Sequence, residues 1–506
     1  MQHALDQSKL EIDWTARAGA LSPSVRHFVG GQWQPDTHGE YIAKYSPRDG
    51  ELLCRFHSAE DREVDLAVEN ARNAFEDGRW SMLSIARRKE ALFKLASLIE
   101  KHTEELALLE SLDVGKPIQD ALTFDVPMAA AIVRFNAEAA DKYYGRVYGV
   151  DRSSLSYQLH RPMGVVAAIV GWNYPLFMAA QKIGPALVTG NSLLLKPSEL
   201  TSFSAARLAE LAIEAEIPEG VFNVIHGGAQ VGAALARHNS VDLVSFTGST
   251  RTGKGLMIAS GESNLKRLLL ECGGKAPNIV FEDSPDLEAV AAAVVQSAFR
   301  NQGEVCVASS RLLVHKSIKN LFLRLLIDRV AKLVVGDPLQ RQTTFGAVVS
   351  DGHRQKVLNY IESGVKEGAR IAYKSQCQIP HSDGFYVLPT VFSDVSPSQK
   401  IAQEEIFGPV LSVIEFRDEA EAISIANSTV YGLSAVLWTK DVARAHRVSQ
   451  SIKAGWVVVN TTGMPVGGPG VGVIAVGGHK QSGLGSEGGL QGIEEYMSST
   501  AVQLFV

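Results

Sequence analysis

The chain has 506 residues, too many for one hydrophobic core, so two or three domains are expected. Its formal net charge of -6 argues against a nucleic-acid partner, and no apolar run approaches the roughly 20 residues of a membrane span. The four cysteines form no C-x-x-C pair, which argues against a disulfide framework or a zinc site and predicts reduced thiols in the cytoplasm.

The N-terminal half begins with helical patterns and then changes to buried strands. Roughly the first 25 residues mix charges every few positions, which excludes a secretory signal and predicts an appended helix or a loose arm. Apolar residues at three- and four-residue spacing predict helices from Glu63 to Leu112. From Val165 onward, strands without polar alternation are each followed by a helix, which predicts a buried parallel sheet: "GVVAAIV", "SLLLKP", "VFNVI" and "DLVSF".

A second series of strands predicts a second α/β domain. It comprises "APNIVF", "RLLVH", "FGAVVS", "VLSVIEF", "SAVLWT" and "AGWVVVN". Two further segments, "SLSYQLHRP" and "STAVQLFV", alternate more clearly and lie at domain edges, so they are expected to pair together or across subunits as an oligomerisation element. The predicted fold class is α/β, with two open parallel sheets and a small β element.

Two glycine-containing segments are candidates for binding phosphate. Gly483, Gly485 and Gly488 match G-x-G-x-x-G, but they follow the polar "GHKQS" rather than a strand, so a surface turn is the better interpretation. In "SFTGST", Gly248 and Ser249 follow a strand and open a helix, where backbone N–H groups favour a pyrophosphate. An ordinary serine N-cap explains this segment equally well.

Eight segments occur in one order between Pro162 and Gly485: "PMGVVAAIVGWNYP", "LLLKPSE", "SFTGST", "LLLECGGKAPNIVF", "NQGEVC", "QEEIFGPVLSVI", "YGLSAVLWT" and "GGHKQSGLG". Together they resemble the aldehyde dehydrogenase superfamily over nearly the whole chain. The resemblance implies a Rossmann-like NAD-binding domain (residues 1–142 and 163–272), a catalytic domain (273–475) and an oligomerisation ribbon (143–162 and 490–506). It also implies a homodimer or homotetramer.

The resemblance assigns chemistry to three residues that, taken singly, would be an inert thiol, a solvated carboxylate and a turn former. Cys306 matches the nucleophile, whose addition to an aldehyde gives a thiohemiacetal that releases hydride to a nicotinamide. Glu271 matches the base that activates water against the resulting thioester. Asn173 matches the amide that, with the Cys306 N–H, holds the oxyanion.

The cofactor residues follow from the same resemblance. Lys196 and Glu199 match residues on the adenosine ribose, and a carboxylate there favours NAD over NADP, which stays a less favoured alternative. Glu405 and Phe407 match the residues that hold the nicotinamide end, and Lys182 matches a lysine near the same site. The other cofactor candidates are Trp172, Gly232, Gly248 and Ser249. No metal is expected.

The substrate positions depart from the family. Three positions that are aromatic in many relatives are Tyr174, Gln181 and Val476 here, and the glycine-rich loop between Asn460 and Gly477 is longer. The interpretation is a wider, partly polar mouth for a moderately bulky, aromatic or heteroaromatic aldehyde, unless the longer loop refills the space. The other predicted pocket residues are Met128, Ile132, Val305 and Val307.

Several alternatives stay open. The substrate could be an aliphatic amino-aldehyde or a semialdehyde. The chain could also be a coenzyme-A-acylating enzyme, which Glu271 disfavours, or a non-catalytic relative, which Cys306, Glu271 and Asn173 together disfavour. Cys272, directly after the expected base, is explained either by packing or as a second thiol that makes the enzyme prone to oxidation.

Overall fold

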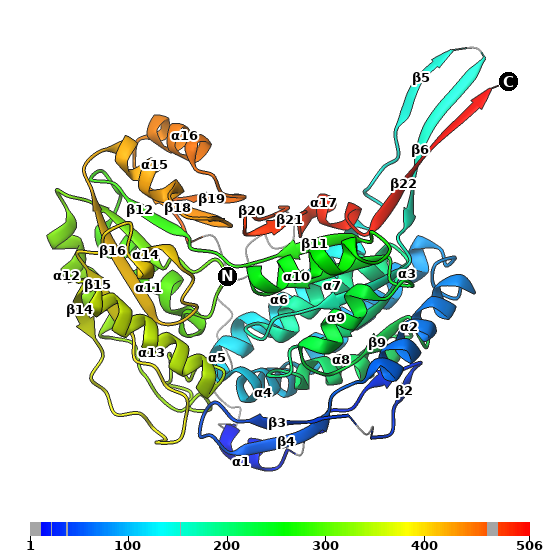
Figure 1. The fold of residues 1–506 in the computed structure, drawn as a ribbon, viewed down its shortest axis with the longest axis horizontal. Helices are drawn as coiled ribbons and strands as arrows, with labels where there is room; N and C mark the ends of the chain where they lie inside the picture. Colours follow the sequence, from blue (N-terminus) through cyan, green and yellow to red (C-terminus); the bar gives the residue numbers. More distant parts are fainter. Residues whose placement is uncertain (1–11, 22, 37–38, 152, 463–473, 506) are drawn as a thin grey trace.

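The computed structural model describes residues 12–21, 23–36, 39–151, 153–462 and 474–505. Figure 1 shows two α/β domains side by side and a β ribbon that projects from the first of them. No helix within the described ranges is long and apolar enough to cross a lipid bilayer.

The first domain is built on an eight-stranded sheet with a parallel centre. Its order is β2-β1-β9-β8-β7-β10-β11-β21, and the outermost pairings at both ends are antiparallel. The strands are β1 (Phe28–Val29), β2 (Gln32–Trp33), β7 (Val165–Ile169), β8 (Ser192–Lys196), β9 (Phe222–Val224), β10 (Leu243–Thr247), β11 (Arg267–Glu271) and β21 (Gly483–Leu484).

Helices cover both faces of this sheet, which explains why its central strands carry no polar alternation. Successive residues of β7 enter different cores: Val166 and Ala168 lie in one hydrophobic cluster, and Val165 and Ala167 lie in the other. The first cluster includes α3 (Ile85–Lys101), α4 (Thr103–Val114), α6 (Val126–Ala139), α7 (Pro175–Val188) and α8 (Phe203–Glu214). The second includes α2 (Asp61–Glu76), α9 (Ala229–Arg237) and α10 (Thr250–Gly261).

The second domain has a seven-stranded sheet, parallel except for the β14–β15 pair, in the order β14-β15-β16-β13-β12-β18-β19. Its strands are β12 (Pro277–Val280), β13 (Arg311–His315), β14 (Arg370–Lys374), β15 (Thr390–Ser393), β16 (Val410–Phe416), β18 (Ser434–Trp438) and β19 (Trp456–Val459). Helices α11 (Leu287–Phe299) and α12 (Lys319–Val330) pack on one face, and the other face is covered by α13 (Asp351–Lys366), α14 (Lys400–Gln403), α15 (Glu419–Asn427) and α16 (Val442–Ser451).

The prediction of a strand at "FGAVVS", residues 345–350, is wrong. The segment makes only one isolated β-bridge, between Phe345 and Val335, and the strand beside β16 at this side of the sheet is β15. Its apolar side chains are buried all the same, and the Ala347 N–H donates to the carbonyl oxygen of Gly115 in the first domain. Phe345 and Val348 lie in the two core clusters of the second domain. The apolar run therefore reflects burial in that core without a place in the sheet.

The predicted partnership of the two alternating segments is confirmed within the chain. β6 (Ser154–Pro162) pairs antiparallel with β22 (Met497–Phe505) along its full length, and β5 (Val147–Asp151) completes the three-stranded ribbon. Figure 1 shows the ribbon extending away from both domains. At its base the Tyr496 and Ser245 hydroxyls lie 2.8 Å apart, which fixes the ribbon to the first sheet.

Two further expectations need correction or refinement. The "GLGSEG" segment is not only a surface turn, because β21 adds to the first sheet with Leu484 opposite Leu270. Gly483 is required there, since a Cβ would lie 2.4 Å from the Leu270 carbonyl oxygen.

The described part of the N-terminal arm is a helix, α1 (Trp14–Gly19), whose Trp14 is buried in the core. The remaining short elements are β3 (Tyr41–Tyr45), β4 (Leu52–His57), α5 (Ile118–Asp120), the π-helix at 121–125, the 3-10 helix at 300–303, β17 (Tyr431–Gly432), β20 (His479–Lys480) and α17 (Gly489–Glu494).

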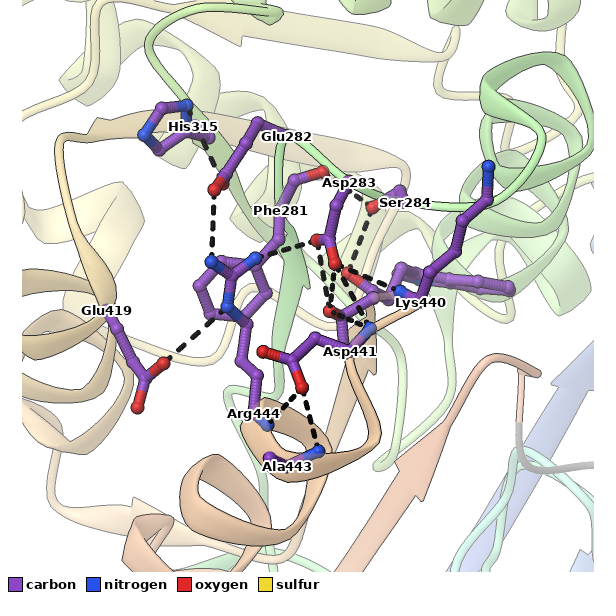
Figure 2. A network of polar contacts seen from close by, with 12 residues as sticks. Phe281, Glu282, Asp283, Ser284, His315, Glu419, Lys440, Asp441, Ala443 and Arg444 are labelled. Atoms are coloured by element: carbon purple, nitrogen blue, oxygen red, sulfur yellow. Dashed lines mark hydrogen bonds and ion pairs between the residues drawn. The ribbon is translucent and has the colours of Figure 1, made fainter.

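A polar network joins the carboxyl ends of β12 and β18 (Figure 2). The Arg444 guanidinium lies 2.7 Å from Asp283, 3.0 Å from Glu282 and 3.5 Å from Glu419. The Arg444 Cζ lies 4.6 Å from the centroid of the Phe281 ring. One mostly buried cation thus pairs with two carboxylates of the loop after β12 and with one carboxylate of α15.

We expect Arg444→Met to lower the free energy of unfolding by about 1–3 kcal/mol, because it leaves these carboxylates without their shared cation. Arg447→Met is the matched control: Arg447 lies three residues further along the same helix, is more exposed and pairs with Glu419, so its loss should lower the free energy of unfolding by less. Urea unfolding of both variants measures the difference. An equal decrease in the free energy of unfolding in both variants would show that the network contributes no more than an ordinary surface ion pair.

Candidate active site

A cavity of about 950 Å³ lies between the two domains. The predicted catalytic, cofactor and pocket residues line it, whereas the buried Lys182, which was predicted near the same site, does not. The lining residues are Met128, Ile132, Trp172, Asn173, Tyr174, Gln181, Lys196, Glu199, Gly232, Gly248, Ser249, Glu271, Val305, Cys306, Val307, Glu405, Phe407 and Val476. At this volume the cavity is large enough for a dinucleotide together with a second small molecule. No three His, Cys, Asp or Glu side chains within the described ranges lie together as metal ligands.

The Asn-Gln-Gly turn presents Cys306 to this cavity. Asn301, Gln302 and Gly303 have φ values of 46°, 55° and 75°, a left-handed run that ordinary residues avoid. A Cβ on Gly303 would lie 2.4 Å from the Gly408 carbonyl oxygen, so only glycine fits. Such strain persists only where the surroundings hold it, and here it turns a partly exposed thiol toward the cavity.

Asn173 is fixed beside Cys306 by hydrogen bonds at both of its ends. Its side-chain Nδ2 donates to the Glu304 carbonyl oxygen at 2.8 Å, and its own carbonyl oxygen accepts from Asn301 and Lys116 at 3.0 Å each. A primary amide has two N–H groups, so one remains for an oxygen in the cavity. The arrangement suits a fixed oxyanion donor.

The Cys306 thiol is protonated at neutral pH in this state. Burial raises its pKa to about 12, and the nearby Glu405 and Glu271 carboxylates add to the shift. A positive charge close to the sulfur would oppose both effects. To act as a nucleophile near neutral pH, this thiol would need a cationic partner in the cavity.

Glu271 is the last residue of β11 and faces the same cavity. Burial raises its pKa to about 8, while Lys182 acts in the opposite direction. Its Oε1 is buried and has no hydrogen-bond partner among the described residues. Lys182 itself forms a buried ion pair with Glu487. A carboxyl group with this pKa can act as a general base close to neutral pH.

The far end of the cavity carries the features of a dinucleotide site. The Ser249 Oγ caps α10 by accepting the Thr252 N–H at 3.2 Å, so the N-cap interpretation is confirmed, and this helix end still faces the cavity. A Cβ on Gly248 would lie 2.5 Å from the Phe246 ring, so this position favours glycine. With no side chain there, the backbone of residue 248 is open to a ligand. The buried Thr247 Oγ1 lacks a partner among the described residues. Lys196 lies 3.5 Å from Glu199.

The part of the cavity lined by the predicted cofactor residues is called the cofactor half here. Its other end is aromatic. Phe407 has a φ of 60°, in the left-handed region, and its ring centroid lies 5.1 Å from that of Trp172. Glu405, two residues earlier, accepts the Gly274 N–H at 2.9 Å. His353, which sequence reasoning missed, lies against both rings.

The substrate half of the cavity, which is the part lined by the predicted pocket residues, contains more aromatic rings than the sequence suggested. Phe135, Phe177 and Trp456 line the cavity, so the rings missing at two family positions are supplied from other positions. Phe177 was within reach of sequence reasoning, since Tyr174, Phe177 and Gln181 have the spacing of one helix face. Most of the glycine-rich loop lies outside the described residues, although Ile474 and Val476 at its end contribute to the wall.

Comparisons with known proteins agree with this geometry. Residues 33–502 match the family model "Aldehyde dehydrogenase family". The chain is 43% identical over 484 residues to the NADP/NAD-dependent aldehyde dehydrogenase PuuC of Escherichia coli, covering 96% of each chain. It is also 43% identical over 474 residues to an aminoacetaldehyde dehydrogenase of Pseudomonas aeruginosa, covering 94% of each.

A solved structure extends the comparison to three dimensions. The indole-3-acetaldehyde dehydrogenase AldA of P. syringae, in complex with NAD+ and IAA, has a TM-score of 0.95 and 45% sequence identity, covering 98% of this chain and 99% of that one. The similarity extends over both domains. This chain therefore belongs to the aldehyde dehydrogenase family.

Proposed function

We propose that this aldehyde dehydrogenase oxidises a moderately bulky aromatic or heteroaromatic aldehyde to its carboxylic acid, with NAD as cofactor. The observation that carries the substrate class is the wall of the substrate half: Phe135, Tyr174, Phe177 and Trp456 line it beside aliphatic side chains. The described carboxylates in this half are Glu271, the expected base, and Glu487, which pairs with Lys182. Glu487 is already paired, and Glu271 is assigned to water activation rather than to binding a substrate ammonium group.

In the proposed reaction Cys306 adds to the aldehyde carbon, and the oxyanion accepts hydrogen bonds from the Asn173 amide and the Cys306 backbone N–H. NAD, when bound, would supply the acceptor for the hydride that leaves the thiohemiacetal carbon, which converts the adduct into the Cys306 thioester, and its positive charge would favour the thiolate. Glu271 then takes a proton from water, which attacks the Cys306 thioester and releases the acid. The apolar side chains of Val305 and Val307 exclude other water from the thioester.

The cofactor preference rests on the adenosine end of the cavity. Glu199, held near Lys196, offers a carboxylate to two ribose hydroxyls and would repel a 2′-phosphate. AldA was solved with NAD+, and PuuC is described as using NADP and NAD. We infer that NAD is used in preference to NADP, with Trp172, Gly232, Gly248, Ser249, Glu405 and Phe407 completing the site.

The hydrolytic step should depend on pH through Glu271. Because burial raises its pKa to about 8, the carboxyl is mostly protonated at pH 7 and cannot accept a proton from water. The deacylation rate is expected to rise about tenfold per unit below pH 8 and to level off above it. Single-turnover hydrolysis across this range measures it. A flat profile would assign water activation to another group.

A panel of aldehydes tests the substrate class. AldA is named for indole-3-acetaldehyde and the P. aeruginosa relative for aminoacetaldehyde, so these two compounds, with phenylacetaldehyde, separate the alternatives. We expect kcat/KM to favour the two aromatic aldehydes by about tenfold or more, the size of effect that buried apolar surface gives. A preference for aminoacetaldehyde would overturn the proposed class. Product analysis with coenzyme A present separates hydrolysis from acyl transfer.

We also infer a homodimer or homotetramer assembled through the ribbon. Its projecting strands expose apolar side chains that a second copy would cover: Val147, Leu155, Leu159, Leu504 and Phe505. The four cysteines are all free thiols, which supports a cytoplasmic location. Light scattering coupled to gel filtration, repeated with Leu159→Glu, tests the assembly: the variant should dissociate while retaining its fold.

A further inference from the structure

We propose that His353 is a positioning residue that holds Phe407 at the nicotinamide end of the cavity and links it, through Glu304, to the Cys306 loop. This inference rests on the proposed cofactor placement. His353 lies near the start of α13, where the Ser350 Oγ accepts its backbone N–H at 3.2 Å. Its imidazole lines the cavity.

The first link is a hydrogen bond to Phe407. The His353 Nε2 lies 2.6 Å from the Phe407 carbonyl oxygen, and because a carbonyl oxygen only accepts, Nε2 carries the proton. Phe407 has a φ of 60°, a conformation that a bulky residue adopts at a cost of about 1–3 kcal/mol. The imidazole therefore holds the carbonyl oxygen of a strained residue in place.

The second link is ring packing across the domain boundary. The His353 ring centroid lies 5.0 Å from Trp172 and 6.2 Å from Phe407, both edge-to-face. Trp172 follows β7 of the first domain, whereas His353 and Phe407 belong to the second. The three rings form one wall of the cavity, with His353 in contact with both of the others.

The third link runs to the nucleophile. The buried Glu304 lies two residues before Cys306; its Oε1 is 3.6 Å from the His353 Nε2 and accepts the Val349 N–H at 3.0 Å. Its backbone carbonyl oxygen accepts from Asn173. Burial raises the pKa of Glu304 well above its usual range and lowers that of His353 to about 4. Both shifts favour the uncharged forms, so the contact acts through geometry rather than through an ion pair.

This arrangement predicts a selective kinetic effect. Without the imidazole N–H, Phe407 is free to leave its left-handed conformation, and the surface on which the nicotinamide is proposed to pack is no longer fixed relative to Cys306. We expect a higher KM for NAD+ and a slower hydride-transfer step, with the KM for the aldehyde unchanged, because the substrate half of the cavity is untouched.

Two variants separate hydrogen bonding from packing. His353→Phe retains a ring against Trp172 but has no donor, and His353→Gln can donate from its amide to the Phe407 carbonyl oxygen. The measurements are the KM for NAD+, the KM for the aldehyde, the rate of the first NADH turnover and the melting temperature. We expect His353→Phe to raise the KM for NAD+ about fivefold or more, the effect of one lost hydrogen bond, and His353→Gln to restore it to within about twofold of the wild type.

Phe407→Ala distinguishes failure of this inference from failure of the proposed site. If Phe407→Ala weakens NAD+ binding but His353→Phe does not, His353 is no positioning residue and the cofactor site stands. Equal kinetic losses in the Phe and Gln variants, or a fall in melting temperature without a change in the KM for NAD+, would likewise overturn the inference. If Phe407→Ala leaves NAD+ binding intact, the cofactor placement on which it rests is wrong.

Discussion

Replacing Cys306 with alanine should abolish aldehyde oxidation while leaving NAD+ binding almost unchanged. The thiol is the only group in the proposed reaction that forms a covalent bond to the aldehyde, and loss of a covalent nucleophile typically costs about four to six orders of magnitude in kcat. The cofactor half of the cavity does not depend on the sulfur. NADH absorbance measures turnover, and isothermal titration measures NAD+ binding.

Cys272→Ala is the matched control, because Cys272 lines the same cavity. Its sulfur would lie 2.8 Å from a Cβ on Gly253, so the side chain packs toward α10, which favours the packing explanation for this thiol. We expect this variant to retain turnover within a few-fold. Loss of activity in Cys272→Ala, with activity retained in Cys306→Ala, would exchange the two roles.

The second large effect is expected for Glu271→Gln. The amide cannot take a proton from water, so the thioester should form and then persist, with hydrolysis slowed about 10²- to 10⁴-fold. Stopped-flow should show a burst of close to one NADH per active site followed by a slow phase. The burst serves as an internal control, because it reports that acylation and the fold are intact.

An unchanged steady-state rate in Glu271→Gln would contradict the assigned base. A variant that lost the burst as well would place Glu271 in acylation instead. In that case the raised pKa of about 8 would report a group that accepts the thiol proton rather than one that activates water.

The parallel sheets could be predicted from sequence because strands that are buried on both faces have continuous apolar sequences. β7 and β8 are fully buried and read as continuous apolar runs. The same apolar pattern misled at residues 345–350, where the side chains are buried in the core of the second domain but the backbone does not join its sheet. β14 and β15 were missed for the opposite reason: β14 is half-exposed and β15 is only four residues long, so neither produces a strong pattern.

The residues of the candidate site could be named from sequence, but their geometry could not. Segments that resemble the aldehyde dehydrogenase superfamily identified Cys306, Glu271 and Asn173, and the structure brings these three residues to one cavity. The left-handed run that presents Cys306 depends on contacts with Gly408, more than a hundred residues later. The pKa values of the thiol and the carboxyl arise from burial, which no local pattern encodes.

The residues that were missed share one property, which is that they act through distant neighbours. His353 stands in a polar helix start and Glu304 reads as part of the nucleophile segment, and only their meeting at 3.6 Å suggests a role. Trp456 lies on an edge strand that reads as ordinary core. Such side chains have no recognisable spacing, since their partners are set by the packing of two domains.

The most direct test of the account is to identify the atom that carries the acyl group. Glu271→Gln should be mixed with NAD+ and phenylacetaldehyde, quenched in acid during the slow phase, digested and analysed by mass spectrometry. The account predicts one acyl adduct per chain, on the peptide that contains Cys306. An adduct on Cys272, or turnover with no adduct on any residue, would contradict it.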